Sequence, residues 1–409
     1  MEKKKKPAIR FKGFTDSWEQ RKLGDVVNRV TRKNQDLVSE LPLTISAQYG
    51  LIDQNEFFDK RVASKDVSGY YLIENGEFAY NKSTSTDAPW GAVKRLDHYE
   101  NGVLSTLYIV FGIKENNPID SNFLVSYYNT NLWHKGIREI AAEGARNHGL
   151  LNIVPADFFE TELMIPQDIE EQKQIGKFFK GLEALITLHQ RKYDKLQIIK
   201  KAMLEKMFPQ NGSCFPEIRF KGFTDSWEQR KLGELGEIMT GSTPSTSKSE
   251  YYSEDGIPWV TPTDINSQTI SDTPRKLSGE GIKVGRVVPA NTILCTCIAS
   301  IGKNTLLTVK GSFNQQINCL TPNEYNDAYF LLTESEIWSN IMKRMAAAGT
   351  MQIVNKTEFS ELTTMVPKLE EQKKIGQYFH TIGHLITLHQ REVEKLQNIK
   401  KSMLETMFV

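Results

Sequence analysis

The sequence predicts an α+β protein in which two tandem, pseudo-repeated α/β domains are joined and spaced by two long antiparallel coiled-coil helices. Residues 9–24 recur without a single change as residues 218–233, the short repeat. Residues 170–208 recur in similar form as residues 370–408, the long repeat. A chain of 409 residues fits two domains with connectors better than a single core. Repeats of this size are domains rather than solenoid units of about 20–50 residues.

Each copy of the long repeat predicts a helix, because apolar residues recur at heptad spacing with charges between them. No proline interrupts the first copy before Pro209. A helix of about 40 residues spans about 60 Å and needs a partner to bury its apolar stripe. The other copy is the obvious partner. The predicted first row of seam residues is Ile175, Leu182, His189, Leu196 and Met203, then Ile375, Ile382, His389, Leu396 and Met403.

The same heptad frame predicts a second seam row that includes Phe178, Leu185, Tyr378 and Leu385. His189 and His389 fall in the first row, where a polar residue often fixes register and orientation. A metal pair or a pH switch is the alternative role. His380 and His384 are four residues apart on one helical face, and we expect that face to be solvated.

The regions between the repeats, 25–169 and 234–369, share little sequence. Short β-rich segments bounded by turns are predicted at 41–52, 70–83, 102–113, 257–265, 287–300 and 311–322. Helical patterns follow at 121–142 and 325–347. A faint match between 102–111 and 311–320 predicts one shared fold with two different surfaces. The predicted divisions are a first domain at 1–168, a central helix at 169–208, a linker at 209–217, a second domain at 218–368 and a final helix at 369–409.

Composition describes a globular protein of 39% hydrophobic and 25% charged residues. The net charge of +1 lacks the basic excess usual in nucleic-acid binders, so any DNA-binding charge must be segregated or supplied by another subunit. No apolar run approaches the roughly 20 residues of a membrane span, and no apolar stretch of a secretory signal follows the basic start. We expect no membrane partner.

The four cysteines are too few for a disulfide framework and favour a reducing cytoplasm. Cys295 and Cys297 are expected on a strand, and they lack the second ligand pair of a zinc site. The sequence contains no phosphate-binding loop, zinc-protease motif, nucleophile elbow or dinucleotide fingerprint. It also lacks the catalytic loop of an amino-methyltransferase and a nuclease-like carboxylate cluster. We therefore expect no catalytic residue, metal or cofactor in this chain.

The order of repeat, variable region and long helix, met twice, resembles the specificity subunit of type I restriction–modification systems. The most specific segments are the Phe-x-Gly-Phe-x-x-x-Trp-x-x-x-x-Leu-Gly openings at 11–24 and 220–233. The helix starts are equally telling: Ile165-Pro166 precedes Glu170-Glu171-Gln172, and Val366-Pro367 precedes Glu370-Glu371-Gln372. The segments at 76–83 and 313–322 look like interior strands of the family's domains.

The resemblance implies that each variable region is a target-recognition domain for one half of a bipartite, asymmetric site in double-stranded DNA. The paired helices would set the spacer, and half-sites about one DNA turn (near 34 Å) apart suit such an arrangement. Two methylation subunits would dock on the repeated regions, and two restriction subunits would join them. S-adenosylmethionine, ATP and magnesium are expected on those partners. The implied location is the bacterial cytoplasm, with the nucleoid.

Base-reading candidates are polar and basic residues of the predicted loops, since such side chains read base edges or hold phosphates. Ordinary loop solvation is the alternative for each. Trp18 and Trp227, within the short repeats, are candidates for contact with a partner subunit, and core packing is their alternative. The DNA-binding candidates are Asn81, Lys82, Ser83, Thr84, Lys94 and Arg95, then Thr261, Thr263, Ser300, Lys303, Gln315 and Gln316.

Two other functions compete. A combined methyltransferase–endonuclease with its own specificity region needs catalytic loops that are not in this sequence. A scaffold that organises other proteins is compatible with the modest net charge. Sequence-specific DNA binding with the partner methyltransferase distinguishes the scaffold from the recognition subunit.

Overall fold

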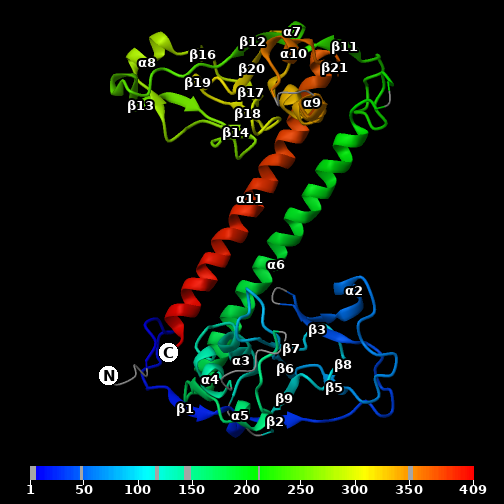
Figure 1. The fold of residues 1–409 in the computed structure, drawn as a ribbon, viewed down its shortest axis with the longest axis vertical. Coiled ribbons are helices and arrows are strands. Elements are labelled where there is room, and N and C mark those ends of the chain that lie inside the picture. The colour runs from blue at the N-terminus through cyan, green and yellow to red at the C-terminus, as the bar shows by residue number, and fades with distance from the viewer. Residues whose placement is uncertain (1–5, 47–48, 116–118, 142–148, 211, 349–352) are drawn as a thin grey trace. The chain divides into compact units, whose positions relative to one another are not determined.

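The computed structural model describes residues 6–46, 49–115, 119–141, 149–210, 212–348 and 353–409. The chain forms two compact units (Figure 1). Unit 1 contains Met1–Leu188 and Glu392–Val409, and unit 2 contains His189–Arg391. The division between the units falls inside both long helices, so each unit holds half of each helix. The domain boundaries given above assign each helix to a segment of its own, and they stay a prediction.

Both predicted long helices are confirmed. Helix α6 spans Ile169–Lys206 and helix α11 spans Leu369–Met407 (Figure 1). Each begins with two glutamates in its first turn, where carboxylates favour the positive end of the helix dipole. Proline at 209 cannot continue α6.

Within each unit the two helical segments pack antiparallel. In unit 2, His189 of α6 contacts His389 of α11, while Met203 and the chain beyond it lie in one hydrophobic cluster with Ile375 and Phe379. In unit 1, Lys400 of α11 forms an ion pair of 2.5 Å with Glu183 of α6. This pairing buries a stripe that neither helix could bury alone.

The first predicted seam row faces the partner helix, but the second row lies one residue later than predicted. In the first row Ile175, Leu182, Ile375 and Ile382 are buried, and the two histidines, Leu196, Met203, Leu396 and Met403 are half-buried. In the second row the buried residues are Phe179, Ile186, Phe379 and Ile386. Leu185 and Leu385, which the heptad frame placed there, are 46% and 38% exposed.

The main sheet of unit 1 has the strand order β2-β9-β6-β7, and every neighbouring pair is antiparallel. Two antiparallel pairs, the hairpin β3-β4 and the non-sequential pair β5-β8, accompany it. The strands are β2 Val27–Val30, β3 Leu43–Ser46, β4 Gly50–Asp53, β5 Tyr71–Glu74, β6 Phe78–Asn81, β7 Ala92–Arg95, β8 Asn101–Leu104 and β9 Ile109–Ile113. The short helices are α1 Leu23–Val26, α2 Gln54–Phe58, α3 Ser121–Tyr128, α4 His134–Ile140 and α5 Pro155–Phe159.

The main sheet of unit 2 has the order β12-β20-β17-β18-β14, beside a second sheet of order β15-β13-β19-β16. The strands are β12 Gly236–Thr240, β13 Tyr252–Val260, β14 Thr269–Ile270, β15 Lys276–Leu277, β16 Val287–Val288, β17 Thr292–Thr296, β18 Asn304–Leu307, β19 Gly311–Phe313 and β20 Ile317–Pro322. The helices are α7 Leu232–Leu235, the 3-10 turn η1 Ser249–Tyr251, α8 Gly279–Val284, α9 Ala328–Ala348 and α10 Lys356–Glu361.

The two units share one core topology, as the faint sequence match predicted. Strands β2, β9, β6 and β7 of unit 1 correspond in order to β12, β20, β17 and β18 of unit 2. The register agrees as well, because Arg29 pairs with Phe111 and the equivalent Ile238 pairs with Leu320. The helical pattern predicted at 121–142 forms two helices, α3 and α4, which are separated by residues 129–133. Residues 47–48 and 142 of the predicted segments lie outside the described residues.

The short repeat closes each unit on the first turn of a long helix. Strand β1 (Glu19–Lys22) pairs with β10 (Glu162–Ile165), and β11 (Glu228–Lys231) pairs with β21 (Thr363–Val366). Arg10 donates two hydrogen bonds to the buried Glu171 carboxylate at 2.6 and 2.7 Å. Arg219 does the same to Glu371 at 2.7 Å for both bonds. Such bidentate pairs fix the position of each short repeat against the first turn of its long helix.

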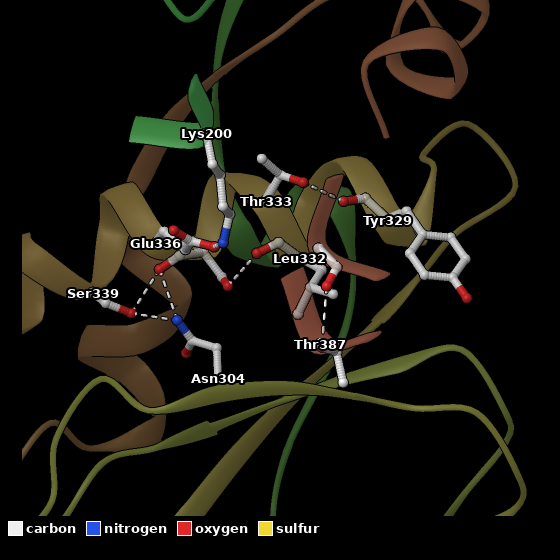
Figure 2. Close-up of polar contacts among 10 residues, drawn as sticks. Lys200, Asn304, Tyr329, Leu332, Thr333, Glu336, Ser339 and Thr387 are labelled. Carbon is white, nitrogen blue, oxygen red and sulfur yellow. Dashed lines mark hydrogen bonds and ion pairs between the residues drawn. The ribbon is translucent and has the colours of Figure 1, made fainter. Parts of the chain in front are cut away.

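In unit 2 the end of α6 is also tied to α9. Figure 2 shows Lys200 reaching Glu336, an ion pair of 2.5 Å. On the same helix, the Ser339 hydroxyl and the Ser335 carbonyl accept hydrogen bonds from the Asn304 amide of β18, at 2.6 and 2.9 Å. Helix, sheet and long helix are therefore held together by polar contacts as well as by apolar packing.

Candidate nucleic-acid interface

In unit 2 most of the predicted base-reading residues gather where three strands end. The parallel strands β13 and β19 stop at Val260 and Phe313, and the next backbone bond joins Asn314 N–H to the Val260 carbonyl at 2.9 Å. The end of β17 lies beside them, because Cys297 N–H donates to the Gln316 carbonyl at 2.8 Å. The candidates Thr261, Gln315 and Gln316 thus share one edge.

The loop after β17 brings the remaining unit 2 candidates to the same edge. The Thr296 hydroxyl donates to the Ser300 carbonyl and accepts a 2.9 Å bond from Lys303 N–H, so one side chain organises the whole turn. Gly302 occupies a positive φ of 81° in this turn, a conformation that favours glycine. Ser300, Lys303, Thr263 and Gln315 are exposed, and Gln316 is half-buried.

The equivalent edge of unit 1 carries Asn81–Thr84 at the end of β6. Thr84 donates through both its backbone N–H (2.6 Å) and its hydroxyl (3.0 Å) to the Gly149 carbonyl, and Leu151 N–H donates to the Lys82 carbonyl at 2.9 Å. The Asn81 side chain accepts from Ser83 N–H at 3.0 Å. Burial lowers the pKa of the half-buried Lys82. Its ammonium is therefore partly stripped of water, the state in which an anionic partner stabilises it most.

Lys94 and Arg95 lie at the opposite end of the strand pair and do not belong to this edge. Antiparallel pairing sets Arg95 against Phe78, the first residue of β6, and Asn81, the last, against Ala92. The Lys94 ammonium donates to Asn129 Oδ1 at 3.1 Å. Burial and the nearby Lys400 lower the pKa of Lys94.

The Arg95 guanidinium makes three hydrogen bonds inside unit 1. It bonds Asp97 (2.7 Å), the Ser121 hydroxyl (2.7 Å) and the Asn122 side-chain carbonyl (3.0 Å), which holds the first turn of α3. Its side chain is 11% exposed. The structure therefore shows Lys94 and Arg95 in contacts within unit 1, and the DNA contact expected for them stays a prediction.

The sequence analysis did not name residues 105–108 of unit 1 or Arg286 of unit 2 as candidates for this edge. Residues 105–108 of unit 1, between β8 and β9, correspond to 314–317 of unit 2, because Val103 and Ser312 occupy matching strand positions. The match between 102–111 and 311–320 carried that signal. Arg286 is exposed beside the unit 2 edge, where its N–H donates to the Ser242 hydroxyl at 2.9 Å. No sequence signal marked Arg286.

Trp18 and Trp227 are core residues. Their exposed fractions are 1% and 2%. Trp18 packs edge-on against Phe408, beyond the end of α11, and Trp227 packs edge-on against Phe208, beyond the end of α6. A direct contact with a partner subunit needs ring surface that neither residue exposes, so the packing role describes both.

These contacts show why both repeats persist in both halves. The short repeat of each half receives the end of the long helix from the other half. The backbone repeats the match, since Ile9 N–H donates to the Thr406 carbonyl at 3.1 Å and Ile218 N–H donates to the Lys206 carbonyl at 2.8 Å. Conservation of the repeats between the halves thus has an intrachain cause.

Cys295 lies on β17 as expected, and Cys297 lies just beyond its end, so only one of the pair is on the strand. Cys214 is exposed, and the other three cysteines are buried and free. Across the described parts of the chain, no group of three or more histidine, cysteine or carboxylate side chains is placed to hold a metal ion.

The family model for the type I restriction modification DNA specificity domain matches residues 15–197 and again residues 224–398. The chain belongs to this family. The two matches fall one on each half, as the shared strand order requires.

This chain is similar in sequence to several specificity subunits of type I restriction enzymes. The HindI specificity subunit of Haemophilus influenzae is 31% identical over 163 residues, which cover 37% of this chain and 35% of that protein. The MjaIX specificity subunit of Methanocaldococcus jannaschii is 28% identical over 207 residues, 48% of this chain and 46% of that protein. The chain thus spans less than half the length of these two relatives. The putative MjaX specificity subunit of M. jannaschii is 22% identical across 96% of this chain and 93% of its own.

The fold recurs in a solved structure of a family member. The crystal structure of a type I restriction–modification S subunit from M. genitalium superimposes with a TM-score of 0.67 at 14% identity and covers 99% of both chains. This likeness concerns the fold alone. Among the described helices, none is both long and apolar enough to cross a membrane.

Proposed function

We propose that this chain is the DNA-recognition subunit of a type I restriction–modification complex and catalyses no reaction itself. The supporting observation is the double family match on two units that share strand order but carry different polar side chains at the equivalent edge. A shared core topology with different edges suits two readers of two different sequences. Each unit reads one half of a bipartite, asymmetric site in double-stranded DNA.

The edge residues of each unit supply the contacts in this proposal. In unit 2 they are Thr261, Thr263, Ser300, Lys303, Gln315 and Gln316, and in unit 1 Asn81, Lys82, Ser83 and Thr84. Amides and hydroxyls read base edges, and lysines hold phosphates. With a net charge of +1, the chain provides few phosphate contacts, so partner subunits contribute much of the non-specific affinity.

Two methylation subunits and two restriction subunits complete the complex, and they carry S-adenosylmethionine, ATP and magnesium. The paired long helices set the spacing between half-sites. Because the tryptophans are buried, the exposed residues at 12–16 and 221–225 of the short repeats offer the matching surface for the two methylation subunits. We place the complex in the cytoplasm, with the nucleoid.

The proposal is tested by mapping methylated adenines in cells that express the chain with its methylation subunits. Lys303→Ala with Gln315→Ala should change or relax one half of the methylated motif and leave the other half and the spacer intact. Lys283→Ala, an exposed lysine of α8 paired with Glu280, is the matched control and should leave the motif unchanged. Changes in both half-sites would contradict one reader per half-site. Methylation that does not depend on the chain would favour a scaffold.

A further inference from the structure

Two histidines face each other inside unit 2, one from each long helix. The Nδ1 atoms of His189 and His389 are 3.0 Å apart, with ring planes inclined by 62°. One ring must donate and the other accept, so one Nδ1 carries a hydrogen and the other offers its lone pair. Two nitrogens of the commonest metal-ligand type are therefore side by side on two different helices.

We propose that His189 and His389 form a chelating site for one divalent transition-metal ion of the Ni²⁺, Cu²⁺ and Zn²⁺ class. With metal–nitrogen bonds of about 2.05 Å, nitrogens 3.0 Å apart subtend about 94° at the metal. This is close to the cis angle of tetragonal Cu²⁺ and Ni²⁺ sites built from nitrogen and oxygen. Each ring must turn about χ2 to direct both lone pairs to one point, where the metal takes the place of the shared proton.

The surroundings leave the pair available for a metal. Both histidines are half-buried, so water can fill the remaining coordination positions. The positive charge of Lys192 acts on His389 electrostatically. Two protein ligands and a nearby cation make this a site of moderate affinity for borderline-soft metals. They exclude a structural zinc site of four protein ligands.

Within the described residues, a histidine pair and an exposed thiol could bind the same ions and must be removed from the test. His380 and His384 lie four residues apart on α11 with ring centroids 6.5 Å apart, and His380 packs on Tyr329. Cys214 is an exposed thiol. The reference protein is therefore the full chain with His380→Gln, His384→Gln and Cys214→Ser.

Calorimetric titration of this reference protein with NiCl₂ or ZnCl₂ is expected to show one equivalent bound. Adding His189→Gln or His389→Gln should each weaken binding at least tenfold, while Lys192→Ala, which removes a neighbouring positive charge, should tighten it. Circular dichroism confirms that each variant is folded.

A second measurement needs no change at the pair. Electron paramagnetic resonance of the reference protein with one equivalent of CuCl₂ should show two imidazole nitrogens on the metal. The proposal is overturned if the reference protein binds no ion stoichiometrically, if the copper spectrum shows no nitrogen pair, or if His189→Gln binds as tightly as the reference. The histidines would then be a hydrogen-bonded polar contact of the seam only. None of these outcomes depends on the proposed function.

Discussion

Replacing Phe408 with alanine tests whether the end of α11 is seated on the short repeat. Phe408 is 5% exposed, and its ring centroid lies 5.9 Å from that of Trp18, 5.5 Å from that of Phe123 and 5.8 Å from that of Phe179. Truncating a buried phenylalanine removes transfer free energy and leaves a cavity, which together cost about 3–5 kcal/mol. The expected loss is in this range because aromatic rings surround the side chain and cannot collapse into the space.

The assay is urea unfolding of the full chain followed by circular dichroism, with hydrogen exchange to locate the loss. The free energy of unfolding should fall by about 3–5 kcal/mol, and exchange should accelerate in the last turns of α11. Phe57→Ala is the control, because that ring is 48% exposed and should cost under about 1 kcal/mol. Equal effects of Phe408→Ala and Phe57→Ala would refute the seating of the helix end on Trp18.

Three further predictions concern single sites. Burial raises the pKa of Glu334 from its ordinary value of 4.5 to about 8. The folded state therefore holds a proton that the unfolded chain loses between these two pH values, and stability falls as pH rises through this window. Calorimetry should show Glu334→Gln raising the melting temperature more at pH 8.5 than at pH 5, and equal shifts would contradict the buried protonated acid. Arg219→Ala leaves the Glu371 carboxylate, whose side chain is 2% exposed, without its partner, and the free energy of unfolding in urea should fall by about 3–5 kcal/mol. The control Lys373→Ala removes an exposed ion pair and should lower it by under about 1 kcal/mol. Equal losses for the two variants would show that the buried pair does not stabilise the fold. In the folded chain one thiol, that of Cys214, should react quickly with a thiol reagent, and rapid reaction of a second thiol would contradict the burial of the other three.

The long helices were predictable because their apolar spacing persists over the whole repeat. The sequence did not determine which residues form the second seam row. Phe178 is followed by Phe179, and Leu185 by Ile186, so sequence periodicity allows two phases that differ by one residue. The choice is made by tertiary packing, which buries Phe179 and Ile186.

The candidate site was predictable where loops are bounded by clear strands. The unit 2 edge came together because its candidates follow strands that end side by side. The internal contacts of Lys94 and Arg95 were not predictable, because a basic residue on a strand gives no sign of its neighbours in the fold. Here α3 and the turn after it supply the acceptors Asn129, Ser121 and Asn122.

The short repeats were interpreted as seats for partner subunits, which left out their intrachain role. Identity of two segments shows that they serve the same contacts, but it does not show whether those contacts lie inside or outside the chain. Burial of Trp18 and Trp227 shows that some lie inside. The exposed residues of the same repeats keep the partner surface as a proposal.

The most direct test of the proposed recognition function is to sequence the methylated adenines in cells with and without this gene. One bipartite, asymmetric motif should lose its methylation when the gene is absent and regain it when the gene is restored. An unchanged methylation pattern in cells that keep active methylation subunits would contradict the proposed recognition function.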